Sequence, residues 1–420
     1  MILLLFTASY PYEGGAEQTF LNTEIQHLRR TFDRVVLIPR KRLGPLLPVA
    51  ECVEVDETYS TTLDNVNPFG AAANILFSRL VYSDLLRRPS LLMYPQAIKR
   101  LISFAVGAQL TRNWVQNWIA KNKANPADCI FYTYWFDQAA LGIGLAKRKY
   151  PQLRLVSRVH GYDLYEEYYY KPPYWPCRPL ALSLLDRLFP DSQAGLSYLN
   201  ARYPNYSSRY ETALLGVTDP GFVNPPSTDG VFRIVSCSML EPVKRVDRIL
   251  AGIQTAASQR PGQRFEWHHI GNGARRDELQ RMADEQLPPN AKGFLPGYQG
   301  KEALMTFYKE QPADVFINAS ETEGTPVAVM EAVSCGIPII ATSVGGNKEI
   351  VGNPNGILID EDPSLQQIAD SFFKLLDSPQ DTRLKRAGSR RIWMERYNAD
   401  GNYSAFAERL KTIRQSETDH

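Results

Sequence analysis

The stretch of sequence that decides the fold is residues 319–351, ASETEGTPVAVMEAVSCGIPIIATSVGGNKEIV. It follows an apolar run at 314–318, so the pattern predicts a buried strand, a turn of small residues and then a helix from Val327. Pro326, beside the first helical position, suits a helix start. The free backbone amides of such a first turn form a seat for a diphosphate.

Similar apolar runs recur along the whole chain, each followed by a loop and a helical pattern. Continuous apolar runs of this kind are typical of parallel strands that are covered on both faces. Two series of them predict an α/β protein of two Rossmann-like domains facing each other across a cleft. The expected strands are 1–7, 34–38, 129–133 and 153–159 in the first half and 232–237, 265–270, 314–318, 337–342 and 357–359 in the second.

Length and composition agree with a two-domain globular protein. A chain of 420 residues is too long for one hydrophobic core, and 218–230, rich in Pro, Gly, Ser and Asp, is the expected linker. The net charge of +2 indicates no nucleic-acid partner. The five cysteines are far apart and lack zinc-ligand spacing, so we expect no metal, no disulfide framework and a reducing compartment.

The apolar start of the chain is too short for a signal sequence, and no run of about 18 apolar residues is present. A cytoplasmic location is therefore expected. Residues 68–123 carry eight basic residues against one acid, Asp84, with aromatic and leucine side chains between them. Such a stretch can sit on an anionic membrane surface or hold an anionic acceptor, or it can be only a solvated helix face.

Two glutamates stand out in the deciding stretch. Glu331 lies one turn beyond the predicted diphosphate seat, where its carboxylate can accept the two hydroxyls of a ribose. Glu323, in the turn before the helix, would face the sugar side of the phosphates. Taken alone, the pair is equally typical of a surface helix whose N-terminal acids are favoured by the helix dipole.

The surrounding residues resemble a known signature. Glu323 and Glu331 with seven residues between them, the segment 332–338, a strand at 339–342, Gly345-Gly346 and Glu349 resemble glycosyltransferase family 4, retaining enzymes of the GT-B fold. The resemblance implies that Glu323 binds donor-sugar hydroxyls and that Glu331 binds the nucleotide ribose. It also implies a nucleotide-diphosphate sugar, such as a UDP-sugar, as co-substrate, with no cofactor and no metal. The turn residues that would meet the donor are Gly324, Thr325, Val327 and Ala328.

Residues 234–247 resemble the family's strand–loop–helix that holds an arginine and a lysine against the donor diphosphate. Lys244 stands at the lysine position, whereas Met239 stands at the arginine position and departs from the pattern. Glycine turns at 270–273 and 294–298 resemble the elements that approach the donor and its base. The resemblance adds four donor-side residues: Ser238, Gly273, Gly297 and Tyr298.

In the first half, the Gly14-Gly15 loop resembles the family's glycine loop at the donor diphosphate and acceptor, and His160-Gly-Tyr-Asp163 resembles its His-Gly-x-Asp element. The resemblance implies that His160 acts near the reacting sugar, together with Lys244 and Glu323. It places Gly15 on the donor side, and we expect Glu17, Tyr162 and Asp163 on the acceptor side. A lone histidine or a glycine pair can also be purely structural.

The expected protein is a retaining glycosyltransferase of the hexosyltransferase type, acting in polysaccharide biosynthesis on a hydroxyl of a glycan or lipid-linked acceptor. We expect an acceptor domain at 1–219, a nucleotide-sugar domain at 220–395 and a last segment, 396–420, that crosses back to the first domain. Peripheral contact at the inner membrane face is expected through 68–123. A sugar-nucleotide epimerase of the same fold and a non-catalytic sugar-nucleotide binder remain as alternatives, the latter because of Met239.

Overall fold

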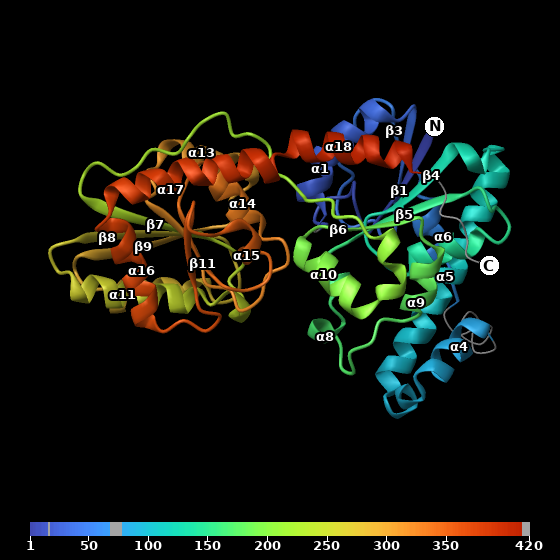
Figure 1. Ribbon diagram of the computed structural model, residues 1–420, viewed down its shortest axis with the longest axis horizontal. Helices are drawn as coiled ribbons and strands as arrows, with labels where there is room; N and C mark the ends of the chain where they lie inside the picture. Colours follow the sequence, from blue (N-terminus) through green and yellow to red (C-terminus); the bar gives the residue numbers. More distant parts are fainter. Residues whose placement is uncertain (16, 68–77, 414–420) are drawn as a thin grey trace. The chain divides into compact units, whose positions relative to one another are not determined.

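The computed structural model describes residues 1–15, 17–67 and 78–413. The chain divides into two compact units (Figure 1). We call Met1–Leu215 together with the chain from Asp400 onward the N-unit, and Gly216–Ala399 the C-unit. Each unit is built around one parallel six-stranded sheet. The sequence predicts a parallel sheet in each half of the chain, but with fewer strands.

The N-unit sheet has the order β3-β2-β1-β4-β5-β6. Leu4 at its centre lies between Val36 of β2 and Phe131 of β4. The strands are β1 (Ile2–Thr7), β2 (Arg34–Pro39), β3 (Val53–Val55), β4 (Cys129–Thr133), β5 (Arg154–Val159) and β6 (Arg187–Pro190).

Alternate residues of the central strand β1 enter two different helical layers because strand side chains point to opposite faces. Leu3 and Leu5 pack in the layer of α1 (Gln18–Thr31) and α18 (Ala399–Thr412), which lie over the same face (Figure 1). Leu4 and Phe6 pack in the layer of α2 (Thr58–Asp64), α5 (Pro95–Asn122), α6 (Gln138–Ala146) and α9 (Arg178–Leu184). Both faces of the strand are therefore buried, which explains its continuous apolar sequence.

The remaining N-unit elements are short or lie at the margins of the sheet. They are α4 (Arg79–Arg87), η1 (Pro89–Met93), η2 (Pro126–Asp128), α7 (Gly161–Leu164), α8 (Glu166–Tyr169), α10 (Gln193–Arg202) and η3 (Pro204–Arg209).

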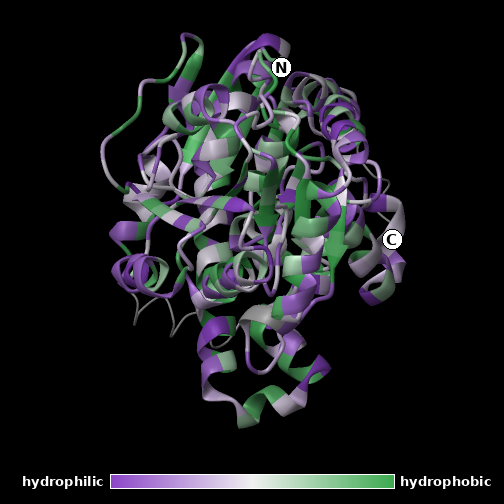
Figure 2. Ribbon diagram, turned by 90° about the vertical axis from the view of Figure 1, so that its left-hand side faces the viewer, coloured by the Kyte–Doolittle hydropathy of each residue, from purple (hydrophilic) through white to green (hydrophobic). Residues whose placement is uncertain are grey.

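The C-unit sheet has the order β12-β11-β10-β7-β8-β9. Its strands are β7 (Val231–Cys237), β8 (Arg264–Ile270), β9 (Ala291–Gly297), β10 (Val315–Asn318), β11 (Ile339–Thr342) and β12 (Gly356–Ile359). Its helical elements are η4 (Pro242–Lys244), α11 (Val246–Gln259), α12 (Arg276–Gln286), α13 (Lys301–Glu310), α14 (Val327–Ser334), α15 (Asn347–Ile350), α16 (Leu365–Leu376), α17 (Pro379–Ile392) and the π-helical turn η5 (Trp393–Tyr397). Figure 2 shows the strands largely in the hydrophobic colour and much of the surrounding helical ribbon in the hydrophilic one.

Nine strands appear where the sequence predicts them, with ends that differ by no more than two residues. Three more, β3, β6 and β9, were not predicted because they are short or carry few apolar residues, as in the sequence AKGFLPG of β9. In both sheets the strand order reverses at the centre, between β1 and β4 and between β7 and β10. Loops after the carboxyl ends of these strands diverge there, which is where open α/β sheets bind ligands.

Candidate functional site

The loops after β7 and β10 bring Lys244 and Glu323 together although they are 79 residues apart in the chain. Lys244 Nζ donates to Glu323 Oε1 over 2.7 Å. The same oxygen accepts from Asn318 Nδ2 at 3.0 Å and from Ser320 Oγ at 2.6 Å. Three donors therefore fix Glu323 Oε1, and no described residue hydrogen-bonds to its other oxygen, Oε2. That oxygen can accept from a hydroxyl group.

A pair of glycines holds the turn that carries Glu323. Gly345 has φ +42°, and a Cβ there would lie 1.8 Å from the carbonyl oxygen of Glu323. The amide of Gly346 donates to the carbonyl of Gly324 over 3.0 Å. Only glycine permits this close backbone approach. The sequence pattern around Gly345 and Gly346 thus has a physical role in placing the turn.

The turn leads into α14, which begins at Val327 as predicted. Pro326 is its N-cap and no side chain caps the helix, so the amides of Val327 and Ala328 in the first turn lack an intrahelical acceptor. The hydroxyl of Thr325 is buried and has no hydrogen-bond partner among the described residues. This helix start therefore offers donors to an anion.

Glu331 lies within α14 and is only 7% exposed. Burial raises the pKa of its carboxyl to about 7, although the nearby charge of Lys301 lowers it. No described residue donates a hydrogen bond to this carboxylate. A buried acceptor without donors is costly unless a ligand supplies them, and ribose hydroxyls are suitable donors.

Backbone hydrogen bonds join the loops after β7, β8 and β9, which carry the other donor-side residues. The amide of Ser238 donates to the carbonyl of Ile270 over 3.1 Å, and the amide of Gly271 donates to the carbonyl of Gly297 over 3.0 Å. A Cβ at Gly273 would lie 2.8–3.0 Å from atoms of Leu240, so that turn also packs tightly. The ring of Tyr298, by contrast, is 72% exposed.

The side chains beside Lys244 take different directions. Met239 is half exposed and supplies no charge. Arg245 is the N-cap of α11 rather than a helical residue, and its Nη1 donates to the carbonyl of Glu361 over 2.8 Å. The carboxylates of Glu321 and Asp362 lie 3.7 and 3.5 Å from its guanidinium. Arg245 is therefore held by neighbouring loops through its own partners.

In the N-unit, His160 directly follows β5 and is buried. Its Nδ1 lies 3.1 Å from Asp191 Oδ2, and its Nε2 lies 3.1 Å from the carbonyl oxygen of Tyr134. Both partners are acceptors, so the arrangement favours protonation of both ring nitrogens. Burial lowers the pKa of His160, but the hydrogen bond and charge of Asp191 outweigh burial and raise the pKa above its ordinary value.

Two further acids anchor loops. Asp163 accepts from the amides of His160 at 2.7 Å and Phe136 at 2.5 Å, and burial raises its pKa to about 6. Glu17 accepts from the amides of Ser9 and Tyr10, and its other oxygen accepts from Trp135 Nε1 at 2.9 Å. Their carboxylates organise the loops after β1, β4 and β5.

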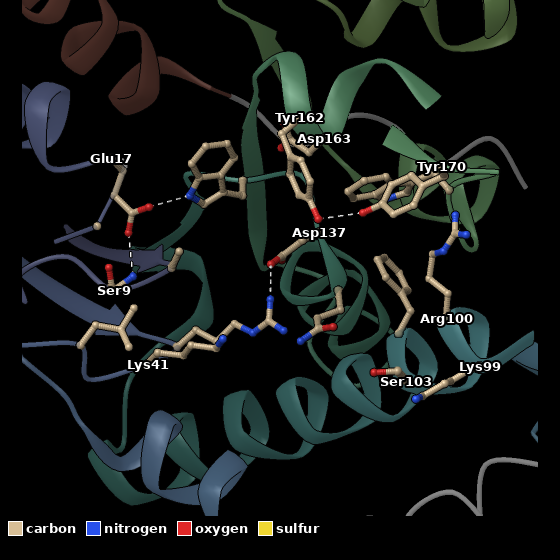
Figure 3. Close-up of a pocket in the computed structure, with 18 of the residues that line it drawn as sticks. Ser9, Glu17, Lys41, Lys99, Arg100, Ser103, Asp137, Tyr162, Asp163 and Tyr170 are labelled. Carbon is tan, nitrogen blue, oxygen red and sulfur yellow. Dashed lines mark hydrogen bonds and ion pairs between the residues drawn. The ribbon is translucent and has the colours of Figure 1, made fainter. Parts of the chain in front are cut away.

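These loops surround a pocket of about 740 Å³ that lies wholly within the N-unit (Figure 3). Gly15, expected on the donor side, lines it together with Glu17, Tyr162 and Asp163, which are expected on the acceptor side, whereas His160 is not part of the lining. The sequence interpretation did not single out Arg40, Lys41 and Asp137, which also line it. Their position directly after the predicted strands 34–38 and 129–133 was a signal that could have found them.

The basic segment 68–123 contributes α4, η1 and α5 to the structure, and its first part, 68–77, lies outside the described residues. Its acid, Asp84, is buried and accepts from Tyr174 Oη and the amide of Cys177. Five large apolar side chains are exposed around η1, and we call them the apolar ridge: Tyr82, Leu86, Leu92, Met93 and Tyr94.

Two general properties bear on the kind of site. Among residues 1–15, 17–67 and 78–413, no three His, Cys, Asp or Glu side chains are grouped so that they could hold a metal ion. No helix in the same ranges has the length and apolar character that crossing a bilayer requires.

Comparisons with known proteins indicate the class of protein that this chain resembles. Residues 223–391, which lie within the C-unit, match the family model described as glycosyl transferases group 1. A GDP-mannose-dependent monoacylated alpha-(1-6)-phosphatidylinositol monomannoside mannosyltransferase of Corynebacterium glutamicum is 27% identical over 192 residues, 44% of this chain. The chain spans 47% of that relative, about half of its length.

The amylovoran biosynthesis glycosyltransferase AmsK of Erwinia amylovora is 25% identical over 336 residues, 77% of this chain and 79% of AmsK. Among solved structures, Alr3699/HepE of Anabaena in complex with UDP matches with a TM-score of 0.64 and 18% identity, covering 98% of this chain and 100% of that one. The chain therefore has the GT-B fold of glycosyltransferases.

Proposed function

We propose that this chain is a retaining glycosyltransferase that moves a hexosyl group from a nucleotide-diphosphate sugar to a hydroxyl of a glycan or lipid-linked acceptor. The observation that carries the proposal is the pairing of Lys244 with Glu323 beside the uncapped start of α14. A cation, free amides and a carboxylate with one free oxygen suit a sugar joined to a diphosphate.

In the proposed reaction, the acceptor oxygen forms a bond to the anomeric carbon while the bond from that carbon to the diphosphate breaks. The acceptor hydroxyl proton passes to the departing phosphate oxygen. Lys244 Nζ and the amides of Val327 and Ala328 stabilise the negative charge of the leaving group. Glu323 Oε2 orients the sugar through its hydroxyls, and Glu331 holds the ribose.

Retention of configuration rests on the resemblance to glycosyltransferase family 4. UDP is the first nucleotide to test because the related Anabaena structure is a UDP complex. We place the protein in the cytoplasm, at the inner membrane face, where the apolar ridge and the basic side chains of α4 and α5 would contact anionic lipid.

Incubation with UDP-, GDP- and ADP-sugars, with and without a mixture of saccharide and lipid-linked acceptors, tests the proposal. A transferase releases nucleoside diphosphate only with acceptor, and the new glycosidic proton in the NMR spectrum reports its configuration. An epimerase converts the free donor without acceptor. Binding without either change would assign the chain as a sugar-nucleotide binder, and no binding of any donor would contradict the proposal.

A further inference from the structure

The N-unit pocket differs from an ordinary saccharide pocket in its charge. Three acids line it, but protein donors engage each of them: Glu17 and Asp163 as described, and Asp137 by the amide of Ala139 at 2.8 Å and by Arg40 at 3.4 Å. Among the described residues, Lys41 and Lys99 form no side-chain hydrogen bond or ion pair, and both are exposed. Four cations, Arg40, Lys41, Lys99 and Arg100, line the pocket against these three acids, so the formal charge of its lining is positive.

Helix α5 presents one polar face to this pocket. Gln96, Lys99, Arg100 and Ser103 all line it, and their i, i+3, i+4, i+7 spacing places them on one side of the helix. Figure 3 shows Lys99, Arg100 and Ser103 on one side of the pocket and Lys41 on the other. Cations from two elements thus line the same pocket.

Arg100 is held in place before any ligand arrives. Its guanidinium lies over the ring of Tyr170, 3.9 Å from the ring centre, and its Nη1 donates to the carbonyl of Tyr174 over 2.7 Å. One of its five N–H groups is used in this contact, so others can donate to a ligand. A fixed planar fork binds phosphate oxygens in pairs with little loss of side-chain entropy.

Aromatic side chains complete the pocket. Trp135, Tyr162, Tyr170 and Trp175 line it, and the hydroxyls of Tyr162 and Tyr170 lie 2.8 Å apart. Aromatic surface with a few convergent polar groups and a volume of about 740 Å³ suits a ligand the size of a small oligosaccharide.

We propose that this pocket binds an acceptor saccharide that carries a phosphate group, with Lys41, Lys99 and Arg100 as the phosphate ligands and the aromatic side chains against the sugar. That the bound saccharide serves as the acceptor rests on the proposed function, whereas the binding of a saccharide phosphate in this pocket does not. The phosphate is either part of a soluble sugar phosphate or the link between a saccharide and a lipid. The apolar ridge ends at Tyr94, one residue before α5 begins, which puts apolar surface next to the helix that carries the cations.

Titration of the whole chain with α-glucose 1-phosphate, glucose and glucuronate tests this proposal. Saturating UDP fills the diphosphate position of the C-unit, so that the phosphate of glucose 1-phosphate cannot bind there. We expect glucose 1-phosphate to bind at least about tenfold more tightly than glucose, and Lys41→Ala/Lys99→Ala to remove that difference. Arg100→Lys keeps the charge but loses the fork, so it should weaken glucose 1-phosphate without changing glucose. Lys121→Ala, on the same helix but outside the pocket, is the matched control and should change neither ligand.

Equal binding of glucose and glucose 1-phosphate, or unchanged binding in the double variant, would overturn the proposal. Glucuronate binding as tightly as glucose 1-phosphate would overturn the assignment of the anion as phosphate. Competition by phosphatidylinositol in phosphatidylcholine vesicles would indicate a lipid-borne phosphate, and indifference to those vesicles a soluble one. A separate titration with UDP distinguishes the two proposals. Failure to bind UDP would count against the donor site in the C-unit and would not affect the result for the N-unit pocket.

Discussion

The two units place ligand-binding loops at the same point of the same kind of sheet, but they leave opposite groups available. In the C-unit, the carboxylates of Glu323 and Glu331 keep unused acceptor capacity, and Lys244 is already paired. In the N-unit, backbone amides and the indole N–H of Trp135 donate to both oxygens of the Glu17 and Asp163 carboxylates, and cations remain available. The C-unit therefore suits hydroxyl-rich groups on a diphosphate, and the N-unit pocket suits an anion.

The largest expected effect tests the C-unit side of this comparison. Lys244→Ala should reduce turnover by about two orders of magnitude or more, because the leaving diphosphate loses its cation in a site of low dielectric. It also removes one of three donors to Glu323. Steady-state kinetics with an identified donor and acceptor measure the effect.

Arg245→Ala is the matched control, since Arg245 is the next residue and its partners are the loops at Glu361 and Asp362. It should change turnover by less than about threefold. Met239→Arg should be neutral or modestly activating. Near-normal turnover of Lys244→Ala would show that this loop does not hold the diphosphate.

The next effect concerns the unpaired carboxylate of Glu331. Glu331→Gln should weaken UDP binding by about 1–3 kcal/mol, roughly fivefold to 150-fold in the dissociation constant, because the ribose loses a charged acceptor. Calorimetric titration with UDP measures this loss. An unchanged dissociation constant would exclude Glu331 from the nucleotide site, and Glu323→Ala should spare free UDP while weakening the UDP-sugar.

The same variant should be more stable than the wild type at high pH. The pKa of Glu331 is about 7 in the folded chain and 4.5 for an unperturbed glutamate, so between these pH values the unfolded chain releases a proton that the folded chain retains. Ionised Glu331 then costs the fold on the order of 3 kcal/mol above pH 7. Urea unfolding should show Glu331→Gln stabilised at pH 8 and close to wild type at pH 4.5.

The sequence singled out more of the residues that the structure groups in the C-unit than of those that line the N-unit pocket, and the reason is physical. Glu323, Gly345 and the start of α14 are fixed by local backbone geometry, which leaves its mark in a short stretch of residues. The N-unit pocket instead depends on long side chains from separate elements, such as Lys41 after β2 and Lys99 on α5. The sequence around each of these residues does not show that the elements share a pocket. Only the ends of the predicted strands and the helical spacing indicate it.

A substitution of His160 distinguishes a role in catalysis from a role in stabilising the N-unit. His160→Ala should lower turnover by at least about tenfold and leave UDP affinity nearly intact if it acts near the reacting sugar. It should also destabilise the unit by about 1–3 kcal/mol, because Asp191 is buried and loses its partner. Early melting with normal turnover would make the histidine structural.

The pH dependence of stability supplies a second measurement for His160. Its pKa is raised on folding, so the stabilisation from the Asp191 pair is complete below the ordinary histidine pKa of about 6.5 and is lost as the pH rises through the higher folded value. Asp191→Asn keeps an acceptor but removes the charge, so its melting temperature should depend less on pH in this window. Equal pH profiles for the two proteins would contradict the ion pair.

The smallest expected effect tests whether the N-unit, and not the C-unit, contacts the membrane. Leu92 and Met93 on the apolar ridge are 63% and 72% exposed, and basic side chains of α4 and α5 flank them. Leu92→Ser/Met93→Ser should weaken flotation with phosphatidylglycerol vesicles by roughly threefold to tenfold, because each side chain buries only part of its apolar surface at the interface. Raising the salt concentration should also weaken flotation of the wild type, since screening reduces attraction between the basic side chains and anionic lipid.

The C-unit offers a matched pair of exposed side chains as a control, Leu384 and Met394, at 65% and 58% exposure. Leu384→Ser/Met394→Ser should leave flotation unchanged, and equal losses in the two double variants would mean that exposed apolar area, rather than the N-unit ridge, sets the binding.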